Sequence, residues 1–291
     1  MDVPECKSGD PPEPANPGQG VDRGMNDDRF ELTVLGTRGS MAVSGPDYAL
    51  FGGATSCYMI RAGQETIFLD GGSGLACAQA DFPHPPVIFL SHLHLDHLIG
   101  LGMYSRLSAR GKQTDIVVPV REGEDPAALL DGLYSPPYWP LKLTQYAGDV
   151  RIVPLRLPVS VGDVLVEGLL GRHPGDCEIF RISWRGRSLV YMTDYEPGEL
   201  TEEEAVAFAK GTDWLLYDGQ YTEQEYPRKK GFGHSTAEGG LRFMRECGAG
   251  HLLIIHHDPL SSDEELLRRE ASLGLPEIRY ARQGEVIRID T

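Results

Sequence analysis

The segment from Val87 to His97 constrains the fold of this chain more than any other part of the sequence. Residues 87–90, Val-Ile-Phe-Leu, form an unbroken apolar run that predicts a short, fully buried strand. The run HLHLDH follows almost at once at residues 92–97. A cluster of imidazoles and a carboxylate at the end of a core strand suits a first-row metal ion, so we expect a rigid core with a metal site at its mouth.

Four side chains of this run are candidate metal ligands: His92, His94, Asp96 and His97. Four ligands on so short a loop cannot all turn to one ion without strain, and we therefore expect them to be divided between two neighbouring ions. Zinc is the expected metal, and manganese and iron accept the same donors. The run thus predicts a metal-dependent hydrolase with two divalent ions.

Hydrophobic patterning predicts an α/β chain. Short apolar runs predict strands at 32–36, 57–62, 66–70, 87–91, 150–157, 161–169, 179–184, 188–193, 214–218 and 251–256. Helices are expected at 96–110, 200–210, 235–247 and 262–273, the first with a buried stripe of Leu98, Leu101, Met103, Tyr104 and Leu107. Strands interspersed with helices in both halves predict an αββα sandwich, two packed mixed sheets with the helices outside.

The overall composition limits the expected cellular location and binding partners of the protein. Residues 1–28 are rich in proline, glycine and polar side chains and are expected to form a flexible tail, with one hydrolase domain over 29–291. The net charge of −16 repels polyanions, so long nucleic acids are disfavoured partners. We expect a cytoplasmic protein, since neither a secretory signal nor a membrane span is recognisable. A homo-oligomer is compatible with the sequence. The five cysteines are scattered and receive no role.

The run HLHLDH resembles the HxHxDH signature of the metallo-β-lactamase superfamily, and the likeness extends from about Phe30 to Pro259. The resemblance implies the αββα fold and a centre with two ions. Its implied ligands are His92, His94 and His173 for the first ion, Asp96, His97 and His256 for the second, and Asp194 as a bridge. His173 and Asp194 come after predicted strands and His256 ends one, as a site at one rim of a sandwich requires.

Two further details follow from the same resemblance. His256, rather than its neighbour His257, is the expected ligand because the superfamily places it directly after an apolar strand, and adjacent strand residues point to opposite sides. Asp70, in the segment DGGSG, is expected to lie beneath the metal loop and to orient it.

The segment GHST at residues 233–236 resembles the phosphodiesterase branch, which includes ribonuclease Z and small cyclic-phosphate diesterases. The resemblance implies that His234 approaches the scissile phosphate, where it stabilises the transition state or protonates the leaving oxygen. Asp96 is a second catalytic candidate, as acceptor of a proton from the attacking water. A structural interpretation stands beside this one: Ser235 or Thr236 caps the following helix, with Glu238 completing a capping box from Ser235.

We therefore expect a dinuclear-metal-dependent phosphodiesterase that hydrolyses a small anionic diester, cyclic ones included. The alternatives are a ribonuclease Z-like nuclease, a lactone or thioester hydrolase, and a ligand sensor without catalysis. Few lysines lie between His97 and His173, where the RNA-gripping basic arm of ribonuclease Z would be sought. The basic cluster Arg228, Lys229 and Lys230 either recruits the anionic substrate or is merely solvated. The aromatic loop 134–140 either walls the pocket or plugs the edge of the core.

Overall fold

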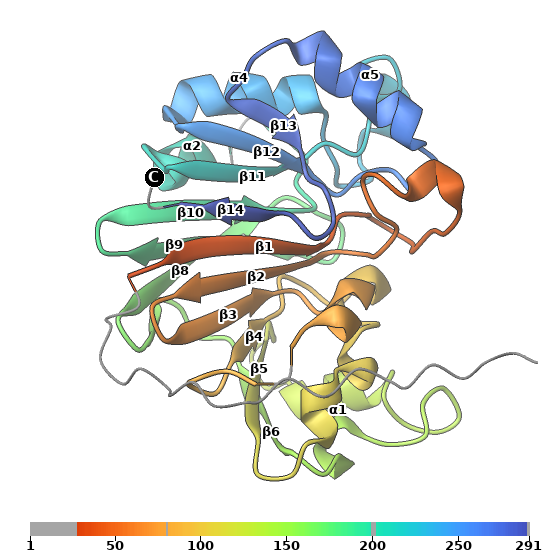
Figure 1. Cartoon of the computed structure of the whole chain (residues 1–291), viewed down its shortest axis with the longest axis vertical. Helices are drawn as coiled ribbons and strands as arrows, with labels where there is room; N and C mark the ends of the chain where they lie inside the picture. The colour runs from red at the N-terminus through yellow and green to blue at the C-terminus, as the bar shows by residue number, and fades with distance from the viewer. Residues whose placement is uncertain (1–27, 80, 199–201, 290–291) are drawn as a thin grey trace, which may run out of the picture.

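Two mixed sheets of seven strands each pack face to face in the computed structural model, which describes residues 28–79, 81–198 and 202–289. The strand orders are β14-β1-β2-β3-β4-β5-β6 and β13-β12-β11-β10-β9-β8-β7, and helices lie on the outer faces (Figure 1). The predicted αββα sandwich is confirmed. The tail predicted for residues 1–28 lies outside the described residues except for Asp28.

In the first sheet, neighbouring strands β3 to β6 run parallel. The carboxyl ends of these strands therefore lie at one rim, where the loops after β3 and β4 also emerge. The strands of this sheet are β1 (Phe30–Gly36), β2 (Cys57–Ala62), β3 (Glu65–Leu69), β4 (Val87–Phe89), β5 (Gln113–Val118), β6 (Asp149–Pro154) and β14 (Val286–Arg288).

In the second sheet, β10 to β13 run parallel, and β9 and β10 form an antiparallel hairpin. The hairpin turns through Arg185 and Gly186, both with positive φ, as a two-residue type I′ connection requires. The chain thus enters β9 and leaves β10 at the same rim. The strands are β7 (Val159–Val161), β8 (Val164–Gly171), β9 (Cys177–Trp184), β10 (Arg187–Met192), β11 (Trp214–Asp218), β12 (His251–Ile255) and β13 (Ile278–Tyr280).

Helices cover the sheets on both sides of the sandwich. The second sheet is covered by α2 (Glu202–Ala209), α4 (Ala237–Cys247) and α5 (Asp263–Leu273), whereas α1 (Pro126–Asp131) contacts β6 of the first sheet (Figure 1). A short helix, α3 (Tyr226–Lys229), precedes the GHST segment. One hydrophobic cluster fills the space between the sheets and two others lie beneath the outer layers. Among the described residues, no helix has the length and apolarity needed to cross a membrane.

The helix predicted for residues 96–110 is wrong. Three short 3-10 helices replace it, namely η3 (Leu95–His97), η4 (Leu101–Met103) and η5 (Ser105–Ser108). The reason is tertiary: His97 O accepts a hydrogen bond from Gly71, and the amide of Gly100 donates to Gly71 O. These backbone groups bond to the DGGSG segment instead of to one another along an α-helix. The predicted stripe is buried, except that Met103 is 63% exposed.

Other predicted details also change. The strand expected over 161–169 is the hairpin of β7 and β8, and β5, β13, β14, α1 and α3 were not predicted. Thr236 is the N-cap of α4 and accepts from Gly239 N, so the predicted capping box from Ser235 is wrong. The Ser235 hydroxyl instead lies 3.1 Å from the Tyr217 hydroxyl.

The aromatic loop 134–140 plugs the edge of the core. The Tyr134 hydroxyl donates to Leu98 O at 2.6 Å, and the Trp139 indole packs directly on Gly102. Tyr134 and Trp139 therefore close the edge of the core, and their rings pack against the protein itself.

Candidate metal centre

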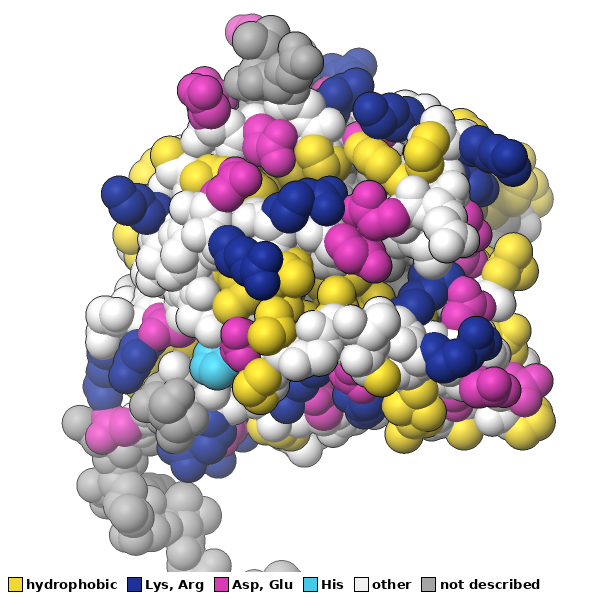
Figure 2. All heavy atoms as spheres, turned by 90° about the horizontal axis from the view of Figure 1, so that it is seen from above, with side chains coloured by type: hydrophobic (Ala, Val, Ile, Leu, Met, Phe, Trp, Pro, Cys, Tyr) yellow, Lys and Arg dark blue, Asp and Glu magenta, His cyan; other side chains and the backbone are white. Residues whose placement is uncertain are grey.

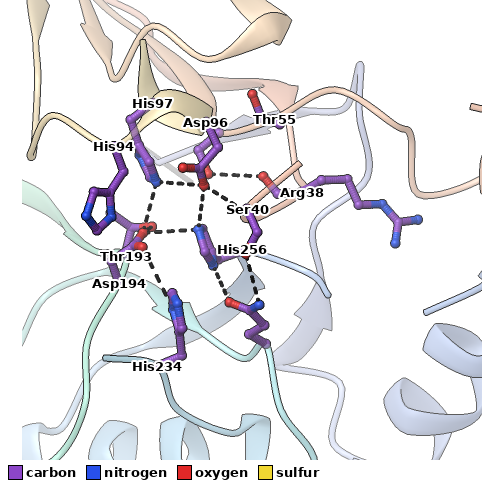
Figure 3. A network of polar contacts seen from close by, with 12 residues as sticks. Arg38, Ser40, Thr55, His94, Asp96, His97, Thr193, Asp194, His234 and His256 are labelled. Carbon is purple, nitrogen blue, oxygen red and sulfur yellow. Dashed lines mark hydrogen bonds and ion pairs between the residues drawn. The ribbon is translucent and has the colours of Figure 1, made fainter. Parts of the chain in front are cut away.

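The predicted site residues meet at the rim where parallel strands of both sheets end. Figure 3 shows six of them, namely His94, Asp96, His97, Asp194, His234 and His256. Asp70 follows β3, residues 91–97 follow β4, Asp194 follows β10 and His256 follows β12. Asp70, Asp194 and His256 have φ of 63°, 48° and 58°. Left-handed backbone at non-glycine residues costs on the order of 1 kcal/mol each and collects at functional sites.

Asp96, His97 and His256 form what we call the floor group, in which the candidate ligand atoms lie within 4.8 Å of one another. Asp96 Oδ2 is 3.2 Å from His97 Nε2 and 3.3 Å from His256 Nε2. All three residues are buried. These three inward-facing atoms can hold one cation.

His92, His94, His173 and Asp194 form a second set, the mouth group, within the same mutual distance. His173 Nε2 lies 3.2 Å from His94 Nδ1, and Asp194 Oδ1 lies 3.8 Å from His92 Nε2 and 3.7 Å from His173 Nε2. His94 is exposed, so this group opens to solvent. A second cation can be held here.

Asp194 faces both groups. Its Oδ1 is directed to the mouth group, whereas its Oδ2 lies 3.1 Å from His97 Nε2 and 3.1 Å from His256 Nε2. A carboxylate between two such sets can bridge a pair of ions. The structure thus brings together all seven residues that the sequence predicted as ligands.

Between the two adjacent histidines, only His256 faces this cluster. His257 is also buried, but its Nε2 donates to Ala281 O at 2.8 Å on the other side of the chain. Burial, reinforced by the nearby Arg38 charge, lowers the pKa of His257 to about 3. A neutral His257 is therefore a packing residue.

Hydrogen bonds outside the cluster hold the imidazoles with one nitrogen directed inward. In each case Nδ1 is the donor. His97 donates to Asp70 Oδ2 at 2.7 Å, His173 to Gly233 O at 3.0 Å and His256 to Gln220 Oε1 at 3.1 Å. His92 Nδ1 lies 3.0 Å from Ser91 Oγ, which donates to Asp70. Such outer contacts fix the tautomer and the ring orientation of metal-ligating histidines.

The chemistry of the donors fits metal ions. Among the described residues, the buried Nε2 atoms of His92 and His97 have no hydrogen-bond partner, although buried polar atoms normally do. Burial lowers the pKa of His256, but Asp194 and Asp96 outweigh it and raise that pKa to about 9. The buried carboxylates thus favour positive charge at the centre, which divalent ions would provide.

His234 stands beside the cluster at its mouth. Its Nδ1 donates to Asp218 Oδ2 at 2.8 Å and lies 3.8 Å from Asp194 Oδ1 (Figure 3). The ring stacks on His256 and remains 8% exposed. His234 can therefore act on a ligand bound at the mouth, although it also lies close enough to Asp194 and His256 to share a cation with them.

Sequence reasoning missed several residues that support the site. Asp218 orients His234, and the Ser40 amide donates to Asp96 Oδ2 at 2.7 Å. The buried Glu196 carboxylate accepts from the amides of Gly231 and Gly233, which fixes the loop before His234. The position of Asp218 at the end of β11 could have marked it in the sequence as a site residue. The roles of Ser40 and Glu196 depend on contacts between loops and have no recognisable pattern in the sequence.

A family model described as a beta-lactamase superfamily domain matches residues 73–257, more than half of the chain. The chain belongs to the metallo-β-lactamase superfamily. Its fold, with two packed sheets and the site at one rim, is the fold of this superfamily.

Three proteins illustrate the relationship of this metallo-β-lactamase superfamily member to known proteins. Ribonuclease Z of Ignicoccus hospitalis is 28% identical over 240 residues, covering 65% of this chain and 77% of its own length. The probable metallo-hydrolase YhfI of Bacillus subtilis is 23% identical over 268 residues, 88% of this chain and 99% of YhfI. The crystal structure of YhfI has a TM-score of 0.66 at 21% identity and covers 90% of this chain and 99% of that one. The crystal structure of a diphosphatase of the PhnP family has a TM-score of 0.65 at 18% identity. It covers 89% of this chain and 97% of the diphosphatase chain.

Proposed function

We propose that this protein is a metal-dependent phosphodiesterase that hydrolyses a small anionic phosphodiester, cyclic ones included. One observation carries the proposal: Asp194 belongs to the mouth group and also contacts His97 and His256 of the floor group, and His234 is held beside them by Asp218. The names of the relatives, ribonuclease Z and a diphosphatase, add support because both describe phosphate chemistry.

The floor group and the mouth group would hold one divalent ion each, with Asp194 in common and zinc as the expected metal. Two bound ions supply Lewis acidity, which polarises phosphoryl oxygens and lowers the pKa of water. The side chains of this protein orient those ions and the substrate.

His234 and Asp96 would act directly on the reacting groups. His234 keeps Nδ1 bonded to Asp218, so in the protonated ring the Nε2–H remains available to donate to the phosphate or to pass its proton to the leaving oxygen. Although burial opposes it, the charge of His97 holds the pKa of Asp96 well below its usual range. Asp96 is therefore ionised and a weak base, and we assign it the role of accepting a hydrogen bond from the attacking water and orienting it.

The basic cluster offers one cation near this mouth. Lys229 Nζ lies over the Tyr221 ring at 5.4 Å from its centroid, and the edge of Tyr221 contacts His234. Lys230 Nζ lies over Tyr226 instead. We therefore assign recruitment of the anionic substrate to Lys229 rather than to the whole cluster.

A ribonuclease Z-like nuclease is the second candidate, favoured by the identity to ribonuclease Z. Charge argues against it. The chain carries a net charge of −16, and Figure 2 shows acidic and basic side chains interspersed on the face covered by α4 and α5. A long polyanion needs a continuous basic surface, whereas a small diester needs only a local cation.

Metal content and phosphodiester hydrolysis, measured on the same preparation, test the proposal. Purified protein reconstituted with zinc or manganese should hold about two ions per chain and should hydrolyse bis(p-nitrophenyl) phosphate only when loaded. A model lactone, a thioester and a precursor transfer RNA serve as competing substrates. Two ions with turnover of one of these competitors alone would overturn the small-diester assignment, and no bound metal would overturn the dinuclear centre.

A further inference from the structure

A cavity of about 620 Å³ lies beside the mouth group. Ser91 and His92 line it, and Gly175 separates it from His94: a Cβ on Gly175 would lie 3.5 Å from His94 Nε2. Glu178, which also lines the cavity, is tied to the metal loop because its amide donates to Ser91 O at 2.9 Å. Its volume falls within the range of small-molecule sites, about 300–1,000 Å³.

About half of the cavity wall is apolar. The large apolar side chains come from the metal loop, α1, β8 and the segments after β5 and β6, and they are Leu93, Val120, Leu129, Leu155, Leu157 and Leu170. Leu170 is 58% exposed, which is unusual for a leucine inside a strand. An apolar group bound here would remove this surface from water.

The charges that line the cavity are three carboxyl groups and one guanidinium. Arg121 Nη2 pairs with Asp176 at 3.5 Å, and the Arg121 amide donates to Glu124 at 2.7 Å. The half-buried Glu178 carboxyl has no side-chain hydrogen bond or ion pair within the part of the chain that the structure describes. An unpaired carboxyl in a partly apolar site is complementary to a cation and repels a second phosphate.

We propose that this cavity binds the organic group of the substrate, and that this group is apolar and carries a positive charge that Glu178 receives. The inference rests on the proposed function and narrows it. The scissile phosphate lies at the metal centre beside Lys229, and the ester group on the His92 side enters the cavity. A substrate with further phosphates on that side, such as an RNA strand, is disfavoured.

Three p-nitrophenyl phosphodiesters test the charge preference, because they differ only in the second alcohol: 4-(aminomethyl)benzyl, 4-methylbenzyl and 4-carboxybenzyl. The metal-loaded protein should prefer the cationic diester to the neutral one by about three- to tenfold in kcat/KM, mainly through KM. The anionic diester should be the poorest. Glu178→Gln should abolish the preference of cation over neutral and keep the rate on the neutral diester. Glu167→Gln on β8, which does not line the cavity, is the matched control.

The apolar wall is tested separately. Leu170→Trp fills the cavity and should raise KM for all three benzyl diesters, while methyl p-nitrophenyl phosphate should be hydrolysed as by the wild type. Calorimetry with 4-methylbenzylamine measures cavity binding without turnover, and Leu170→Trp should weaken it. Equal kcat/KM for the three diesters, or an unchanged preference in Glu178→Gln, would overturn the cavity assignment and leave the phosphodiesterase intact. Amine binding by a metal-loaded protein that hydrolyses none of the diesters would instead overturn the proposed function and keep the cavity.

Discussion

The floor and the mouth of the candidate metal centre are built differently. The floor group is buried, and its members bond to Asp70, to the Ser40 amide and to Gln220. The mouth group includes the exposed His94 and adjoins His234 and the cavity. His92 and His173 of the mouth group are also held by outer contacts, so the two groups differ chiefly in the exposure of His94. A buried, fixed donor loses less freedom than an exposed one when it binds an ion. We therefore expect floor residues to govern metal retention and mouth residues to govern substrate binding and turnover.

Asp194→Ala should abolish the difference between floor and mouth, because it removes a side chain that faces both groups. We expect loss of both ions and a fall in kcat/KM of at least about 10³-fold. Elemental analysis and hydrolysis of bis(p-nitrophenyl) phosphate measure the two effects. Asp149→Ala, an exposed aspartate on β6, should change neither. Retention of two ions by the Asp194 variant would contradict the bridge.

His234→Ala should separate turnover from metal retention. We expect kcat to fall by about 10²- to 10⁴-fold, the usual contribution of a positioned acid or base, with the metal content unchanged. His84→Ala removes an exposed histidine and is the control. Full activity would reduce His234 to a structural role, and loss of one ion would make it a ligand, as its distance to Asp194 permits.

Asp70→Asn tests the support of the floor. An amide accepts weakly from the Nδ1 of His97, so metal affinity of the floor group should fall by about 10- to 100-fold. Asp70 also reaches His92 through Ser91, and the mouth group should therefore weaken to a smaller extent. Chelator titration of the metal-loaded protein resolves the two affinities. An equal loss at both positions would show that floor and mouth are a single unit.

Lys229→Ala should have the smallest effect and act on substrate capture alone. Removing one partly exposed cation near His234 should raise KM for bis(p-nitrophenyl) phosphate about two- to fivefold, with kcat unchanged. Added salt should shrink the difference from the wild type. Lys230→Ala is the matched control because Lys230 lies over Tyr226. Equal effects of both variants would show that the whole basic cluster, and not Lys229 alone, recruits the substrate.

The layer order was predictable because strands and helices follow local hydrophobic patterns. The run HLHLDH was recognisable as a candidate metal site because it follows an apolar strand, whereas His173, Asp194 and His256 were expected through the resemblance to the superfamily. The supporting contacts were not predictable. Ser40 and Asp96 are 56 residues apart, and their hydrogen bond exists only because both loops emerge at the same rim. The segment after His97 has helical periodicity, yet its backbone bonds to Gly71, which outweighs local propensity.

The hairpin of β9 and β10 fixes the spacing between two of the candidate ligands, His173 and Asp194. His173 precedes β9 and Asp194 follows β10, so the pairing register of the two strands sets how the ligands face each other. One residue inserted within either strand would turn alternate side chains to the opposite face and misalign the ligands. The turn at Arg185 and Gly186 lies at the far end of the hairpin. Extra residues or a reporter group can therefore be accommodated there with the spacing of the two ligands preserved.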